Sequence, residues 1–251
     1  MMLILLRAFA FDPVVEDLGD GEIDWTNLRL IAGADGASAT GVLASIEAME
    51  GDARAKLGPK MLDLCRKIRI SSRQYASDLL EAHDAVSDRL DDNKSIFEVF
   101  ESQYFTSGSV HIEAALPIHA WLRPALTHLA QGVERPAAAA GVTGVVVDAR
   151  GLKVAPAVAP RLREAGGAVI YSVETLSEYA ASLRPPVVYV HDPADPVAVK
   201  RAGAEPLFVR ASAIVEETDL VLDELDAPRV TEAAALTDFL LHGNVVIVVD
   251  P

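Results

Sequence analysis

The sequence predicts an α+β fold with two small domains, each a mixed α/β sheet, joined by an Ala/Pro-rich linker. Three observations predict this class. The second half carries six short β-branched segments, typical of strands, with helical segments among them. The first half combines a long helical repeat with an alternating strand pair. Between the halves, VERPAAAAG has the composition of a linker, so we place the domains at residues 20–132 and 141–251.

The first domain is expected to open with a strand over residues 23–31, IDWTNLRLI, and a loop, GADGASATG. A helix follows, because apolar residues recur every three or four positions and share one face. They are Ile46, Met49, Ala53, Leu57, Met61, Leu64 and Ile68. A proline inside a helix removes a hydrogen bond, so we expect a kink or a restart at Gly58-Pro59.

The remainder of the first domain predicts a strand, a helix, a hairpin and a broken helix. IRISS is short enough for one strand, and Tyr75, Leu79, His83, Val86 and Leu90 lie on one face of a second helix. Residues 96–105 and 109–116 predict two strands joined by the turn TSGS, since the second strand alternates apolar and polar residues. HAWLRPALTHLAQG is expected to form a broken helix or a wrap.

The second domain is predicted to be rich in strands. They are GVVVDA, GAVIYS, PVVYVHD, PLFVRA, DLVLDEL and NVVIVVD. DPVAVKRAGAEP predicts a short helix that ends at Gly203. TEAAALTDFLLHG predicts another helix, with Thr231 as N-cap and Gly243 as C-cap. NVVIVVD lacks a proline or a charge before Asp250, so it is either a buried central strand or an edge that invites a neighbouring chain.

Composition limits the partners. The 251 residues are 51% hydrophobic, which supports a packed core, and the net charge of −15 makes nucleic acid and anionic lipid unsuitable partners. One basic segment contrasts with this charge, and we interpret it as a solvated helix face: Arg54, Lys56, Lys60, Arg66, Lys67, Arg69 and Arg73. Cys65 is expected to be a buried thiol. The apolar N-terminus, MMLILLRAFAFDP, is too short to span a bilayer. It is a signal-peptide remnant, the product of a misplaced start, or a first strand.

Three apolar strands each end in an aspartate: Asp148, Asp192 and Asp250. If these strands are parallel neighbours, their carboxylates converge where open α/β sheets bind ligands, and with His191 and Asp195 they could hold Mg²⁺. The alternative is structural, since Asp after a strand bonds nearby backbone N–H groups. The chain has no phosphate-binding loop, G-x-S-x-G, H-E-x-x-H or paired C-x-x-C motif. We therefore expect the capping role, with no catalytic, cofactor-binding or metal-binding residues.

Several segments, in this order, resemble a bacterial envelope family. They are EIDWTNLRLIAGADGA, DARAKLGPKMLDLCRKIRISS and YFTSGSVHIEAALPI, followed by TGVVVDARGL, APRLREAGGAVIYS, VVYVHD, GAEPLFVRA and NVVIVVD. The first three resemble the FlgP flagellar assembly lipoproteins and their small lipoprotein relatives, and the others resemble a downstream domain of larger relatives. The chain departs from that family at Gly58-Pro59, in lacking the lipobox cysteine, and in a signal peptide that is absent or truncated.

The resemblance implies a non-enzymatic structural or assembly protein associated with the cell envelope, such as a ring or disc scaffold of the flagellar motor. It implies a periplasmic or outer-membrane-associated location and no cofactor. The expected partners are further copies of the chain in a homo-oligomer, or other envelope or flagellar proteins, without nucleic acid and without a transmembrane span. Two alternatives remain from the residues themselves. One is a metal-dependent α/β enzyme that uses Asp148, Asp192 and Asp250, and the other is a partner-binding module that presents a sheet edge.

Overall fold

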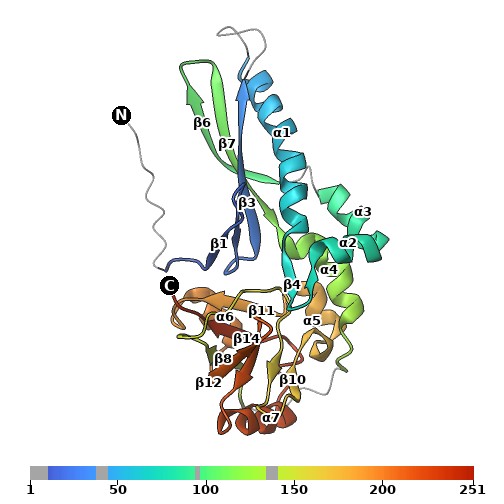
Figure 1. Ribbon diagram of the computed structural model, residues 1–251, viewed down its shortest axis with the longest axis vertical. Coiled ribbons are helices and arrows are strands. Elements are labelled where there is room, and N and C mark those ends of the chain that lie inside the picture. Colours follow the sequence, from blue (N-terminus) through green and yellow to red (C-terminus); the bar gives the residue numbers. More distant parts are fainter. Residues whose placement is uncertain (1–10, 38–44, 94–96, 134–140) are drawn as a thin grey trace.

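The computed structural model describes residues 11–37, 45–93, 97–133 and 141–251, and it confirms the α+β class (Figure 1). Two large sheets are present in these ranges. The first has five strands in the order β1-β2-β3-β7-β6, and the second has seven in the order β10-β9-β13-β12-β8-β14-β11. Most of the predicted linker, residues 134–140, and the first ten residues of the apolar N-terminus lie outside the described ranges.

The first sheet is antiparallel. Its strands are β1 (Val15–Asp17), β2 (Glu22–Asp24), β3 (Arg29–Ala37), β7 (Ser109–Pro117) and β6 (Glu98–Phe105). The predicted single strand over 23–31 is wrong, because the chain turns after β2. The Asp24 carboxylate accepts hydrogen bonds from Asn27 N and Arg29 Nε, both at 2.9 Å, and Leu28 takes a positive φ of 48°. These contacts close a tight hairpin.

The predicted loop after residue 31 is also wrong over residues 33–37, which belong to β3. Residues 38–41 of that loop lie outside the described ranges. The small residues of this stretch serve close packing rather than chain flexibility. A Cβ atom on Gly36 would lie 2.0 Å from the Met49 carbonyl oxygen, so only glycine lets the following helix approach β3 so closely.

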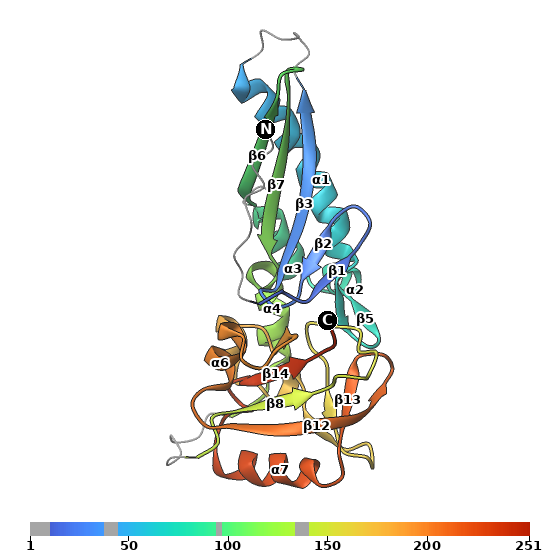
Figure 2. The same cartoon turned by 90° about the vertical axis from the view of Figure 1, so that its left-hand side faces the viewer.

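That helix, α1 (Ile46–Arg66), covers one face of the first sheet (Figure 2). Its buried residues are Met49, Ala53, Leu57, Met61, Leu64 and Cys65, which confirms most of the predicted face and the buried thiol, whereas Ile46 is exposed. Burial raises the pKa of Cys65 well above its ordinary value. The predicted restart at Gly58-Pro59 is wrong, since the helix continues through Pro59. Pro59 and Ala55 are exposed, so water can bond the Ala55 carbonyl that Pro59 leaves without a donor.

The other elements of the first half follow the prediction with two differences. β4 (Arg69–Ser71) forms a small ribbon with β5 (Gln74–Tyr75). The second helix is split at His83 into α2 (Ala76–Ala82) and α3 (Asp84–Asn93), because His83 has an extended conformation. The β6–β7 hairpin is confirmed. α4 (Ile118–Leu129) is continuous despite Pro124, so the predicted break is wrong.

The second sheet is mixed. β8 (Gly144–Asp148), β11 (Val187–Val190), β12 (Pro206–Val215) and β14 (Val245–Val248) are parallel in the order β12-β8-β14-β11. β9 (Leu162–Arg163), β10 (Val169–Tyr171) and β13 (Asp219–Leu222) extend the sheet beyond β12. β14 has a strand on each side and is buried throughout, so NVVIVVD is a central strand.

Short helices connect these strands: η2 (Val173–Thr175), α5 (Glu178–Leu183), α6 (Pro196–Ala202) and α7 (Asp226–Leu236). α6 ends at Gly203 with a positive φ of 79°, as predicted. The predicted caps of the last helix are wrong. Thr231 lies inside α7, where its hydroxyl donates to the Ala227 carbonyl at 3.1 Å, and α7 ends seven residues before Gly243.

The two halves share an interface. Thr26 Oγ1 donates to the Tyr189 carbonyl at 2.7 Å, and the Trp25 and Tyr189 rings meet edge to face with centroids 6.0 Å apart. Arg69 Nη1 donates to the Pro156 carbonyl at 2.8 Å. One cluster of buried apolar residues runs through both halves. In the described part of the chain, no helix is long and apolar enough to cross a membrane.

Candidate functional site

The three aspartates of the metal hypothesis lie at one edge of the second sheet. β8, β14 and β11 are parallel neighbours, so Asp148, Asp250 and Asp192 follow the same ends of adjacent strands. This is the arrangement that the metal hypothesis requires. Whether the three carboxylates could bind a metal ion depends on the hydrogen bonds that they already make.

Each carboxylate accepts a hydrogen bond from a nearby backbone N–H group. Asp148 Oδ1 accepts from Arg150 N at 3.1 Å, Asp250 Oδ2 from Gly151 N at 2.8 Å, and Asp192 Oδ1 from Ala194 N at 2.8 Å. These are the contacts expected of aspartates that fix a turn after a strand. Gly151 has a positive φ of 83°, which completes the turn after β8.

A guanidinium supplies the positive charge at this edge. Arg150 Nε and Nη2 donate to the two Asp148 oxygens at 2.8 and 2.7 Å. This bidentate pair lowers the pKa of Asp148 and raises that of Arg150, and the charges of Asp192 and Asp250 raise the Arg150 pKa further. Arg150 therefore offsets the carboxylate charge that a divalent ion would otherwise offset.

His191 and Asp195 do not join the three carboxylates as ligands. His191 Nδ1 lies 3.3 Å from the Val249 carbonyl, and buried Asp195 accepts a hydrogen bond from Val197 N at 2.7 Å as the N-cap of α6. Within the described ranges, no three His, Cys, Asp or Glu side chains are grouped so that they could hold a metal ion.

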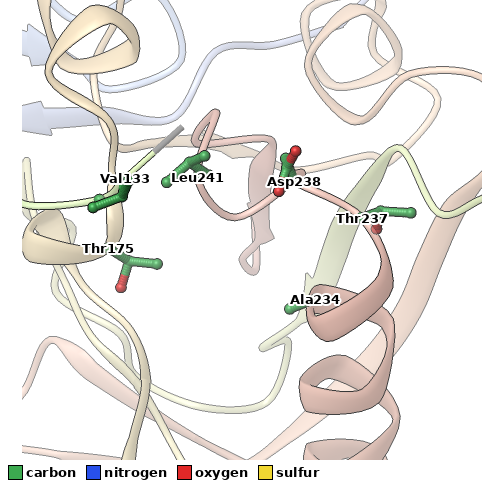
Figure 3. Close-up of a pocket in the computed structure, with 7 residues that line it drawn as sticks. Val133, Thr175, Ala234, Thr237, Asp238 and Leu241 are labelled. Carbon is green, nitrogen blue, oxygen red and sulfur yellow. The ribbon is translucent and has the colours of Figure 1, made fainter. Parts of the chain in front are cut away.

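A pocket of about 530 Å³ lies between α7, η2 and the end of the first half (Figure 3). Its lining is mainly apolar, with Val133, Ala234 and Leu241, together with Gly132, Thr175, Thr237 and Asp238. Both hydroxyls are engaged, since Thr175 Oγ1 accepts from Ser172 N at 3.1 Å and Thr237 Oγ1 donates to the Ala233 carbonyl at 3.0 Å. The pocket therefore offers apolar volume with little free hydrogen-bonding capacity.

The most exposed regular element is β6, a feature that sequence reasoning missed. It is the outermost strand of the first sheet, paired only with β7 among the described strands (Figure 2). Seven of its eight residues are exposed. Three carry aromatic rings: Phe100 is 39% exposed, Tyr104 51% and Phe105 50%. The Tyr104 hydroxyl donates to Glu50 of α1, which ties this side chain to the helix.

On the opposite side of the same sheet, the outermost strand β1 has only three residues, and α1 closes the part of β3 that lies beyond β2. Beyond residue 31, β3 has β7 on one side but no longer has β2 on the other. Side chains of α1 bond the freed backbone groups there. Lys60 Nζ donates to the Gly33 carbonyl at 2.8 Å, Lys56 Nζ to the Asp35 carbonyl at 3.0 Å, and Ala37 N donates to Asp52 Oδ2 at 2.9 Å.

The interpretation of the basic segment as a solvated face is confirmed for Arg54, Lys56, Arg66 and Lys67, which are exposed, but it missed specific contacts of several members. Lys56 and Lys60 protect a sheet edge, which is a known use of lysine in β proteins. Arg69 and Arg73 join the two halves, through Pro156 and through an ion pair with Glu216. The spacing of the charges in the sequence does not indicate these roles, because the roles depend on which strands pack beside α1 in the fold.

The second half of the chain matches a known protein family. Residues 144–251, less than half of the chain, match the family model described as the second domain of Treponema pallidum Tp0624. The matched region contains every strand of the second sheet and begins at the first residue of β8. No curated protein matches the chain.

Proposed function

We propose that the chain is a non-enzymatic assembly protein of the cell envelope, which joins other protein chains by adding a strand to the first sheet at β6. The carrying observation is the long, exposed and aromatic edge of β6. An edge strand presents unpaired N–H and C=O groups to any extended segment that approaches it, and proteins use such edges for recognition.

The contrast between the two sides of the first sheet supports this function. The β3 side is closed by Lys56, Lys60 and Asp52, whereas β6 carries no lysine and no proline that would discourage pairing. A protein that avoided association would protect both sides.

The envelope location and the form of the assembly come from the resemblance to the FlgP-like family. A ring or disc around the flagellar motor is the form that this resemblance favours, and it requires repeated contacts between copies of the chain. The capping contacts of Asp148, Asp192 and Asp250 support a role without catalysis.

Site-specific photo-cross-linking in cells that make the protein tests this function. A photoreactive amino acid replaces Tyr104 on β6 in one variant and exposed Tyr179 on α5 in the control. We expect protein adducts in the envelope fraction from position 104 and far fewer from position 179. Equal adduct yields from the two positions would contradict assembly at β6.

A further inference from the structure

A shallow apolar groove adjoins β6 on the side of α1. Its walls include Leu62 and Pro59 of α1 and Phe97, which directly precedes β6, and its volume is about 600 Å³. One charged side chain, Arg54, also lines it, with its guanidinium over the Phe97 ring at 6.0 Å from the centroid. Its floor is made of small residues: Gly51, Ala55 and Gly58. Because these residues are four and three positions apart, they lie on one side of the helix. The groove therefore runs along α1 next to the start of β6.

The two glycines of the floor have no packing partner among the residues that the structure describes. A Cβ atom on Gly51 or Gly58 would meet no heavy atom of those residues within 4 Å. A glycine inside a helix is less stabilising than alanine, so each of the two lowers the stability of the free helix. Gly36, in contrast, is required by the contact of β3 with α1. Because Gly51 and Gly58 have no side chains, another chain can come close to the backbone of α1 at these two positions.

The charged side chains of β6 determine which kind of segment can pair with this strand. Glu98 and Glu101 are the only charged residues of β6, and Glu101 pairs across the strand with Glu113 of β7. A second copy pairing through its own β6 would bring two more glutamates to this edge, in a chain of net charge −15. Like charges on adjacent strands are unfavourable, whereas Lys or Arg beside Glu98 and Glu101 is favourable.

From this groove and these charges, and resting on the proposed function, we infer that the β6 edge takes an extended basic segment of a different protein. Side chains alternate between the two faces of a strand. A segment added to β6 therefore directs every second side chain toward the α1 groove, where apolar residues fit. The intervening side chains face the same way as Glu101, where Lys or Arg fits. Backbone hydrogen bonds to β6 supply affinity, and the two faces supply selectivity.

Synthetic peptides test the assignment on the full chain. The probes are a fluorescent peptide of alternating lysine and valine and its partner of alternating glutamate and valine. We expect the Lys-Val peptide to bind, to protect β6 amides from hydrogen exchange, and to weaken about tenfold or more between about 50 and 300 mM salt. We expect no binding of the Glu-Val peptide.

Two variants separate the charge from the groove. Glu101→Lys should weaken the Lys-Val peptide by about tenfold or more and allow the Glu-Val peptide to bind. Its control is Glu232→Lys on exposed α7, which makes the same change in net charge. Gly58→Leu places an apolar side chain in the groove, at a position where an added Cβ atom has space. It should also weaken the Lys-Val peptide by about tenfold or more, whereas Ala235→Leu on α7 should not.

The outcomes are distinguishable. Equal binding of both peptides, no protection of β6, or no effect of Glu101→Lys would overturn the basic partner. A second copy on β6 would appear as a dimer whose formation protects the β6 amides from hydrogen exchange, and it would also overturn the assignment. If position 104 yields protein adducts in cells while the basic peptide fails to bind, the proposal of assembly at β6 is retained. Only the inference that the partner is basic is then wrong.

Discussion

Glu101 of β6 lies directly opposite Glu113 of β7, in the register that pairs the two strands. Two like charges face each other across the hairpin, on the face that points away from α1. Cross-strand pairs of like charge destabilise a sheet, so this pair lowers the stability of the strand that forms the proposed edge. Stability is thus given up at the place where we propose that a partner binds.

The first prediction concerns this pair. Glu101→Gln removes the repulsion and keeps the length of the side chain, so it should raise the free energy of unfolding by about 0.2–1 kcal/mol. Urea unfolding at low salt measures the change, with Glu232→Gln on α7 as the control. A lower free energy of unfolding for Glu101→Gln would show that Glu101 makes a favourable contact in the free chain.

The second prediction concerns self-association. The chain should sediment as a monomer at about 20 mM salt, because the net charge of −15 and the acidic edge keep copies apart. At about 150 mM salt the Debye length falls to about 8 Å, so any homo-oligomer should become more populated. Sedimentation velocity at both salts measures this. A single monomer peak at both salts and at high protein concentration would exclude the ring or disc for the isolated chain and leave a partner-binding module.

The third prediction concerns Asp148. Its pKa is lowered by the hydrogen bonds from Arg150, so the carboxylate stabilises the fold above its unfolded pKa, and this contribution is lost as the pH falls through the lower, folded pKa. Because the side chain is 40% exposed, Asp148→Asn should cost at most about 1 kcal/mol at pH 7 and less in acid. Thermal unfolding of both proteins from about pH 2 to about pH 7 measures the cost of the substitution and its dependence on pH. Calorimetric binding of one Mg²⁺ per chain, lost in Asp148→Asn, would restore the metal hypothesis.

The fourth prediction concerns the division of the chain. The composition of VERPAAAAG predicts that limited proteolysis cuts first between Gly132 and Gly144. The shared cluster and the contact of Thr26 with Tyr189 predict that the two fragments remain associated after the cut. Gel filtration of the nicked protein, followed by denaturing electrophoresis, measures this. Fragments that elute separately would indicate two independent domains, and early cuts inside residues 150–230 would contradict the predicted boundary.

Local patterns predicted those elements that local physics determines. The apolar strands before Asp148, Asp192 and Asp250 were predictable because strands buried on both faces have continuous β-branched runs. The hairpin was predictable because β7 alternates. Residues 33–37 were not, because their small side chains serve the approach of α1, a tertiary contact with no local signal. The exposed edge was not predictable either, since FESQYF lacks an alternating pattern and its exposure depends on which strand lies outermost.

The last prediction separates glycines by their surroundings. Gly58 lies inside α1, and a Cβ there meets no heavy atom of the described residues within 4 Å. Gly58→Ala should therefore raise the free energy of unfolding by about 0.5–1 kcal/mol through helix propensity. Gly36→Ala should lower it, because the new Cβ would lie 2.0 Å from the Met49 carbonyl oxygen, and α1 must move away from β3 to relieve the clash.

Urea unfolding of both variants measures the contrast, and the signs of the two changes are the test. If Gly58→Ala destabilises the chain, Gly58 has a structural role in the free protein, and its place in the floor of the groove needs no partner to explain it. If Gly58→Ala stabilises the chain while weakening the Lys-Val peptide, the chain retains a glycine that its own fold does not require. In that case Gly58 lowers the stability of the free protein but strengthens its contact with another chain, and this contact explains why a glycine stands at the position.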